Sequence, residues 1–287
     1  MKTAVMTDTN SGIHAIEAEE LGIYVIHMPV IIDNETFYEG DTISEEDFFA
    51  ALTGNKQVKT SQPSPGDVMD LWDRILSEGY DELVYIPMSS GLSNSCAAAA
   101  GLALDYDSKV EVIDNHRISV TMRESVLQAK ALADDGASAK EIKKVLEDDA
   151  YQSSIYLTVN TLEYLKKGGR ITPAAAMIGT VLSIKPILTI QGEKLDSFAK
   201  SRGPMKKAEE KMIAAVKSDL ENRFSDHDMS KLHIGAAGAG LSDEEKSQWV
   251  GLLKDAFPDT DIFYNPLSAS ISVHTGPGAV GIGISFR

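Results

Sequence analysis

Cysteine and long apolar runs are almost missing from this sequence. The only cysteine among 287 residues is Cys96, which excludes an internal disulfide and a cysteine-rich zinc site. No stretch approaches the roughly 20 consecutive apolar residues that a membrane-spanning helix needs. The N-terminus reaches an acidic residue at Asp8, too early for the apolar core of a secretory signal. We therefore expect a cytoplasmic protein in a reducing compartment.

Basic residues are also scarce relative to acidic ones. The chain has 27 Lys and Arg against 43 Asp and Glu, a net charge of −16, which repels nucleic acid and anionic lipid surfaces. We therefore expect no nucleic-acid partner. Basic residues do gather around residues 166–170 and again around Lys200 and Arg202. Such clusters on an acidic protein favour a small anionic ligand or an acidic partner, although solvated helix ends would look the same.

Several motifs of catalysis and cofactor binding are missing. The sequence has no P-loop and no G-x-S-x-G nucleophile elbow. Its six histidines do not occur in H-x-x-x-H or H-E-x-x-H, so we expect no catalytic metal. Residues 276–281 match G-x-G-x-x-G, but only six residues follow and they are typical of a strand. A dinucleotide fingerprint opens a helix, so this match predicts no nucleotide cofactor.

The pattern that is present alternates strands and helices. Short apolar runs at residues 3–6, 83–87 and 110–114 are separated by amphipathic stretches, which predicts a mainly parallel sheet with helices on both faces. The second half predicts paired strands at 185–190 and 194–199, a helix at 172–182 and further strands towards the C-terminus. We predict an α/β protein with an N-terminal α/β domain at residues 1–152 and a C-terminal α+β domain at residues 153–287.

Three loops rich in hydroxyl groups adjoin predicted strands. Ligands gather at the carboxyl ends of parallel strands, where free N–H groups and hydroxyls favour an anion such as a carboxylate. Capping of helices and turns would explain the same serines and threonines. The loops are Thr60-Ser61-Gln62-Pro63-Ser64, Ser89-Ser90-Gly91-Leu92-Ser93 and Ser272-Val273-His274-Thr275-Gly276-Pro277-Gly278.

The same residues leave a catalytic alternative open. Ser93 as nucleophile, His274 as base and Asp8 as the group that orients the base would form a triad, because triads follow no fixed sequence order. A serine-dependent acyl hydrolase or acyltransferase is therefore the competing hypothesis. An acyl adduct on the purified protein or turnover of an ester would favour this hypothesis.

The ordered set of motifs resembles the DegV family, the fatty-acid-binding proteins also called FakB. The resemblance spans about 280 residues, and its order along the chain makes it specific. It is carried by residues 5–9, the first two hydroxyl loops, Leu162-Glu163-Tyr164-Leu165-Lys166-Lys167-Gly168-Gly169-Arg170-Ile171, Lys185-Pro186-Ile187-Leu188 and His274-Thr275-Gly276-Pro277-Gly278-Ala279-Val280-Gly281.

The resemblance implies a two-domain α/β fold with a long-chain fatty acid buried between the domains. Members of this family present the fatty-acid carboxylate to a separate kinase, FakA, which makes an acyl phosphate for phospholipid synthesis. The binding protein itself is then no enzyme and needs no cofactor, and transient membrane contact would serve lipid exchange. By position, Ser61 and Ser93 are expected to hydrogen-bond the carboxylate, with Thr60 and His274 nearby.

The resemblance also assigns roles to two arginines. Arg170 and Arg202 look like the family's basic pair, which handles the new phosphate or docks the kinase. Two departures from the family pattern concern these regions. Gly203-Pro204-Met205 follows Arg202 where many relatives are more basic, and Asn94-Ser95 follows Ser93 where Gly-Thr or Gly-Ser is usual.

Overall fold

The computed structural model describes residues 2–177 and 184–287 and contains three sheets. The first sheet has four parallel strands in the order β2-β1-β6-β7. Helices α1, α5 and α6 cover one face and α3 and α4 the other, as the alternating pattern predicted. The elements are β1 (Thr3–Asp8), α1 (Ala15–Leu21), β2 (Ile23–Ile26), α3 (Pro65–Ser77), β6 (Glu82–Ile86), α4 (Ser95–Ala103), β7 (Val110–Val112), α5 (Ser119–Asp134) and α6 (Ala139–Asp148).

Side-chain alternation explains why this sheet is buried on both faces. On β1, Ala4 and Met6 pack under α3 and α4, whereas Val5 points to α1 and α5. Successive residues of a strand point to opposite faces, so a sheet covered on both sides needs continuous apolar strands. Cys96 of α4 is buried in the first of these two layers, and burial raises the pKa of its thiol to about 12.

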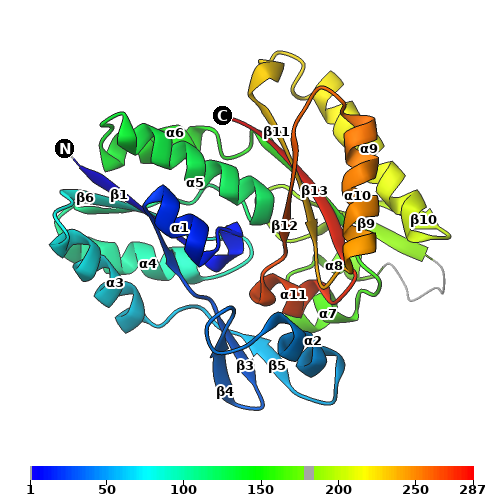
Figure 1. Cartoon of the computed structure of the whole chain (residues 1–287), viewed down its shortest axis with the longest axis horizontal. Helices are drawn as coiled ribbons and strands as arrows, with labels where there is room; N and C mark the ends of the chain where they lie inside the picture. Colours follow the sequence, from blue (N-terminus) through cyan, green and yellow to red (C-terminus); the bar gives the residue numbers. More distant parts are fainter. Residues whose placement is uncertain (1, 178–183) are drawn as a thin grey trace.

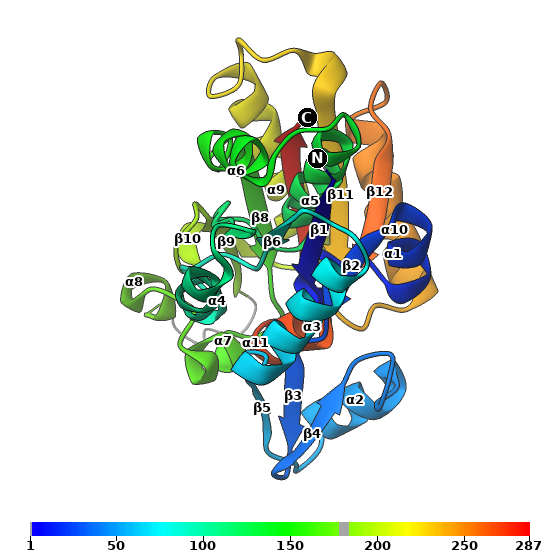
Figure 2. The same cartoon turned by 90° about the vertical axis from the view of Figure 1, so that its left-hand side faces the viewer.

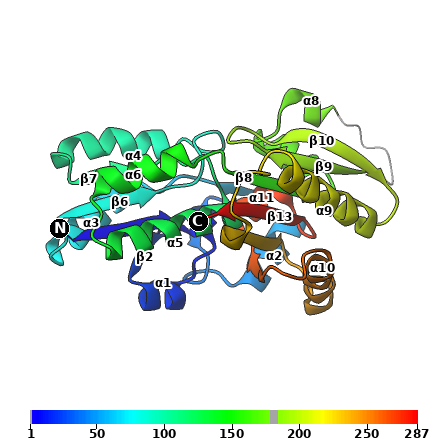
Figure 3. The same ribbon diagram turned by 90° about the horizontal axis from the view of Figure 1, so that it is seen from above.

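The second sheet has six strands in the order β10-β9-β8-β13-β11-β12, antiparallel except for the β11–β12 pair. The two sheets lie side by side (Figure 1, Figure 3). Helices α9 and α10 cover one face of the second sheet, and its other face turns to the loops of the first. The elements are β8 (Ser153–Thr158), β9 (Ile184–Ile190), β10 (Asp196–Arg202), α9 (Met205–Glu221), β11 (Leu232–Gly238), α10 (Asp243–Ala256), β12 (Ile262–Pro266) and β13 (Val280–Phe286).

A third, antiparallel sheet lies below the other two and was not predicted (Figure 2). Its strand order is β4-β3-β5, and it packs against α2 and α11. Residues 35–38 have no recognisable strand pattern and residues 59–65 are typical of a loop, because three- and four-residue strands give almost no periodicity. The elements are β3 (Pro29–Ile32), β4 (Glu35–Tyr38), α2 (Glu45–Thr53), β5 (Val58–Thr60), α7 (Glu163–Gly168), α8 (Pro173–Ala176) and α11 (Ala269–Thr275), and three 3₁₀ turns lie at Thr9–Ser11, Leu104–Tyr106 and Met229–Lys231.

Two further expectations concern the second half of the chain. The helix predicted at 172–182 is present at Pro173–Ala176, and residues 178–183 lie outside the described part. The six-stranded sheet begins with β8 at Ser153, but α5 packs against β1 of the first sheet and also against β11 and β13 of the second. The division into domains at residues 152 and 153 therefore stays a prediction.

The two large sheets meet through Val120 of α5. Gly235 and Gly283 lie directly opposite each other on β11 and β13. A Cβ on Gly235 would lie 2.5 Å from Val120 Cβ, and one on Gly283 would lie 2.6 Å from Val120 Cγ2. Only glycine at both positions lets the helix approach the second sheet this closely.

We expect Gly283→Ala to lower the free energy of unfolding by about 1–3 kcal/mol, because the added methyl group overpacks the contact with Val120. Val120→Ala in the same chain should recover part of this loss, so the two effects should not add. Urea denaturation followed by circular dichroism measures both. Gly251→Ala is the control, since Gly251 lies in α10 with open space around its Cα. Strict additivity of the two substitutions would contradict the close contact.

Candidate functional site

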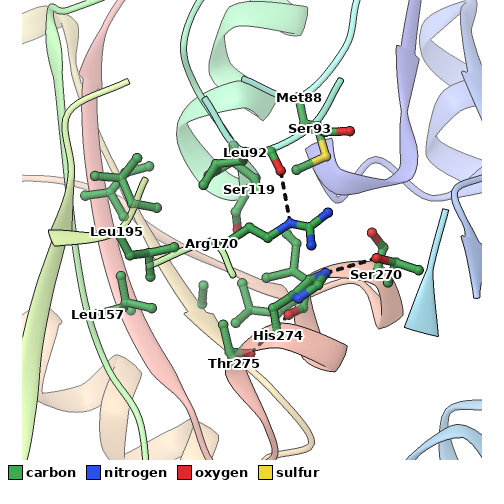
Figure 4. Close-up of a pocket in the computed structure, with 18 of the residues that line it drawn as sticks. Met88, Leu92, Ser93, Ser119, Leu157, Arg170, Leu195, Ser270, His274 and Thr275 are labelled. Carbon is green, nitrogen blue, oxygen red and sulfur yellow. Dashed lines mark hydrogen bonds between the residues drawn. The ribbon is translucent and has the colours of Figure 1, made fainter. Parts of the chain in front are cut away.

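An apolar cavity of about 240 Å³ lies where the loops of the first sheet face the second sheet. Its apolar wall comes from both sheets and from the helices between them. Met88 and Leu92 contribute from the first sheet's loops, Leu157 from β8 of the second sheet, and Leu195 from the residue just before β10. The polar side chains gather on one side of this cavity, away from Leu157 and Leu195 (Figure 4).

The structure brings most of the predicted site residues into this one cavity. Thr60 ends β5, Ser61 follows it, Ser93 lies in the loop after β6, His274 lies on α11, and Arg170 follows α7. These five residues come from segments up to 214 positions apart in the chain. Residues of all three hydroxyl loops therefore line one cavity. Their roles toward a ligand remain predictions.

His274 is held by Thr60 and is neutral. Thr60 Oγ1 and His274 Nε2 share a hydrogen bond of 3.0 Å. Burial and, next, the charge of Arg170 lower the pKa of His274 to about 4. Its Nδ1 is buried and has no hydrogen-bond partner among residues 2–177 and 184–287. Gly168 makes room for this ring, since a Cβ at that position would collide with Nδ1. Packing on Gly168 and the hydrogen bond to Thr60 thus fix the orientation of the imidazole ring.

Ser93 is oriented by the first turn of α4. Its Oγ accepts hydrogen bonds from the backbone N–H of Ser95 at 3.2 Å and from the Ser95 hydroxyl at 3.0 Å. A hydroxyl that accepts twice keeps its own hydrogen for donation. Ser93 is therefore set up to donate to an acceptor in the cavity. Ser61, which also lines the cavity, is exposed, and its backbone N–H donates to Pro29.

Arg170 supplies the positive charge of the site. Its Nε donates to the Leu92 carbonyl at 3.3 Å, and one terminal nitrogen donates to the Gly168 carbonyl. In the described part of the chain, no Asp or Glu forms an ion pair with it. Its guanidinium lies between the Ser93 loop and His274 (Figure 4). The remaining N–H groups are thus free to bind an anion in the cavity.

Arg202 is not brought to Arg170. Arg170 lies beside Leu195, whose N–H donates to the Arg170 carbonyl at 2.9 Å. Arg202 is the last residue of β10 and lies seven positions after Leu195. Seven residues of extended backbone span roughly 20 Å. Its side chain is exposed and does not line the cavity. The structure therefore supports no joint action of the two arginines on one small group, and docking of a partner remains the predicted role of Arg202.

The residues of the alternative triad do not form one. His274 is hydrogen-bonded to Thr60, and no hydrogen bond between Ser93 and His274 occurs among the described residues. Asp8 accepts from the N–H of Asn10 at 2.8 Å and of Met88 at 2.9 Å. Burial raises the pKa of Asp8 to about 6, but its carboxylate does not orient His274. A nucleophile activated through this histidine is therefore not built.

Sequence reasoning missed part of the site because it treated α11 as a loop. Ser270 lines the cavity one helical turn before His274, and Ser119 lines it at the start of α5. Ser268 caps α11 by accepting from the Ile271 N–H. The spacing of Ser270, Ile271 and His274 on one helix face was the available signal. Hydroxyl-rich composition concealed it, because serine and threonine are poor helix formers.

Two general features complete the description of the site and its setting. In the described ranges 2–177 and 184–287, no group of three or more His, Cys, Asp or Glu is arranged to hold a metal ion. Within the same ranges, no helix has both the length and the apolar character needed to cross a bilayer.

The pKa of His274 is open to direct measurement. We expect its ring carbon–proton signals in NMR spectra to stay unchanged between pH 8 and pH 5, and His274→Gln identifies these signals by their loss. An unfolded histidine binds a proton near pH 6.5, so the wild type should lose stability relative to His274→Gln as pH falls from about 6.5 to 4. A midpoint near pH 6.5 in the folded protein would contradict burial beside Arg170.

Comparison with known proteins agrees with this geometry. The sequence profile of the DegV family of uncharacterised proteins matches residues 2–287. A DegV domain-containing protein of Clostridium acetobutylicum is 32% identical, with 98% of this chain and 97% of that protein covered. A DegV domain-containing protein of Streptomyces coelicolor is 29% identical, with 99% and 98% covered.

Solved structures show the same fold and a common ligand class. A fatty-acid-binding DegV family protein from Thermus thermophilus has a TM-score of 0.86 and 27% identity, covering 100% of both chains. The fatty acid binding protein DegV from Bacillus subtilis has a TM-score of 0.84 and 28% identity, again with 100% of both chains covered. The profile match over nearly the whole length, together with these relatives, shows that the chain belongs to the DegV family.

Proposed function

We propose that this protein binds a long-chain fatty acid in the apolar cavity and presents its carboxylate to a separate fatty-acid kinase. The observation that carries the proposal is the gathering of Ser93, Arg170 and His274 at one side of an otherwise apolar space. Such a space fits a molecule with one anionic head group and a hydrocarbon tail. The fatty acids bound by solved DegV relatives belong to this class.

The hydrocarbon tail supplies most of the binding free energy. Removing one CH₂ from water contributes about 0.8 kcal/mol, so a C16 chain gains on the order of 10 kcal/mol in an apolar cavity. The carboxylate opposes burial unless donors meet it. The Ser93 hydroxyl, the Thr60–His274 pair and the Arg170 guanidinium are the donors that the cavity provides. We assign the carboxylate to these groups and to Ser61.

The proposed transfer needs no catalytic residue on this chain. A carboxylate oxygen forms a bond to the γ-phosphorus of ATP bound by the kinase, the bond from that phosphorus to ADP breaks, and an acyl phosphate results. The binding protein positions the oxygen and excludes water from the tail, which lowers the entropic cost of the reaction. In this proposal the protein acts in the cytoplasm, serves phospholipid synthesis and contacts a membrane transiently to exchange lipid.

We expect Ser93→Ala to weaken palmitate binding about 10- to 100-fold, because a lost hydrogen bond to a charged group costs roughly 1.5–3 kcal/mol. Ser61→Ala should act in the same direction. Displacement of a fluorescent fatty acid measures both affinities. Ser90→Ala is the matched control, since Ser90 is exposed in the same loop and does not line the cavity. Wild-type affinity in both variants would refute the head-group assignment.

Substitution of Arg170 and substitution of Arg202 should change different quantities, palmitate affinity in the first case and acyl-phosphate formation in the second. Arg170→Gln should lower palmitate affinity roughly 10-fold or more, because it removes the charged donor of the cavity, and Arg170→Lys should recover only part. Arg202→Gln should leave that affinity within about twofold and lower acyl-phosphate formation with the cognate kinase and ATP, as expected for a docking residue outside the cavity. Reduced palmitate affinity in Arg202→Gln, or unchanged product formation, would contradict this division.

A further inference from the structure

A second cavity lies directly behind the head-group site. It has a volume of about 630 Å³ and shares Thr60, Arg170 and His274 with the apolar cavity. Its outer wall comes from the third sheet and from α7, which both contact α11. Figure 2 shows α7 and α11 side by side above β5. The two cavities are thus separated by the side chains that form the Thr60–His274 hydrogen bond and by Arg170.

The second cavity is basic, although the protein is strongly acidic. Lys56, Lys59 and Lys167 line it together with Arg170, against the single carboxylate of Glu163. The whole chain has 27 basic and 43 acidic residues, so acidic residues predominate in the chain whereas basic residues predominate in the lining of this cavity. Among residues 2–177 and 184–287, none of the three lysines forms an ion pair or a side-chain hydrogen bond. Cations gathered without counter-charges favour an anionic occupant.

Each lysine has an ordinary structural explanation when taken alone. Lys167 lies in the last turn of α7, where a cation compensates the helix dipole. Lys59 lies on β5, an edge strand, where lysine discourages pairing with another chain. Neither explanation accounts for their convergence, with Lys56 from the loop between α2 and β5, on a cavity whose inner wall is the head-group site.

We propose that this second cavity, the lysine pocket, holds the phosphate that becomes attached to the fatty-acid carboxylate. The inference rests on the proposed function. An acyl phosphate keeps its tail in the apolar cavity, so its phosphate must lie directly beyond the carboxylate. A group with up to two negative charges cannot enter the apolar cavity, and the lysine pocket is the adjoining cationic space. Lysine ammonium groups bind phosphate as point charges, and Arg170 can bridge both cavities.

The same chemistry would suit free phosphate. Two probes separate this source from the phosphate of the tethered product. The compound 2-oxoheptadecylphosphonate carries the palmitoyl tail and has a phosphonate in place of the phosphate. Its phosphonate group cannot be transferred to another molecule. Inorganic phosphate, added to the palmitate-loaded protein, lacks the tail. We expect the phosphonate to bind through the lysines and inorganic phosphate not to bind at millimolar concentration. This result would assign the pocket to a phosphate that is attached to the acyl chain.

The experiment compares affinities for palmitate and for the phosphonate by calorimetry in wild type and in Lys56→Gln, Lys59→Gln and Lys167→Gln. Each substitution should lower phosphonate affinity about three- to tenfold and palmitate affinity less than about twofold, because the phosphonate brings more charge closer to the lysines. Lys254→Gln on α10 is the control, since it removes an equal charge from an exposed position outside the pocket.

The outcomes are distinguishable. A wild-type protein that fails to bind palmitate would refute the proposed function and with it the pocket. If the wild type binds palmitate normally but the lysine variants lose affinity for palmitate and for the phosphonate equally, the lysine pocket alone would be overturned. The lysines would then act on both ligands only through their long-range electrostatic field. Phosphonate affinity that none of the three lysine variants changes would also overturn the pocket, as would tight lysine-dependent binding of inorganic phosphate. Unchanged thermal unfolding of the variants shows that the comparison concerns intact protein.

Discussion

The distance between the two large sheets depends on the contact of Val120 with Gly235 and Gly283, and the site depends on that distance. Val120 also lines the apolar cavity, so the residue that joins the sheets forms part of the ligand's wall. Ser93 is carried by a loop of the first sheet, whereas Arg170 and His274 belong to segments that border the second. Hydrogen bonds to one carboxylate tolerate errors of only a few tenths of an ångström. The contact between Val120 and the two glycines must therefore be rigid if residues from both parts of the molecule are to bind the same carboxylate.

The electrostatics of the site balance binding against reactivity. A buried carboxylate needs donors, but several fixed cations around it would hold its oxygens too tightly for attack on phosphorus. The cavity provides neutral hydroxyls, a neutral imidazole and the Arg170 guanidinium, and places the lysines behind them. In the proposed function the charge around the head group thus increases along the direction in which the phosphate is added. The hydrophobic tail holds the ligand throughout, so the head group can change without release.

The sequence predicted the large elements and marked the hydroxyl loops as candidate ligand sites, because long periodic segments and strand ends have strong local signals. It did not predict the third sheet, whose short strands are stabilised by packing on α2 and α11 rather than by their own pattern. It treated α11 as a loop because Ser270, Ser272 and Thr275 disfavour a helix that tertiary contacts nevertheless stabilise. The separation of Arg170 from Arg202 follows from strand length and direction, which no local motif contains. The basic cluster at residues 166–170 pointed to an anionic ligand, but its convergence with Lys56 and Lys59 depends on tertiary structure and was not predicted.

The burial of Cys96 has a chemical consequence for the whole molecule. A thiol with a pKa of about 12 stays protonated at neutral pH, and only the thiolate reacts readily with oxidants and alkylating reagents. Since Cys96 is the only cysteine, the folded protein behaves toward thiol chemistry as if it contained none. Oxidising conditions that cross-link or sulfenylate exposed cysteines leave no such mark on the folded chain, and a cysteine introduced at its surface would be its sole site for thiol-directed labelling.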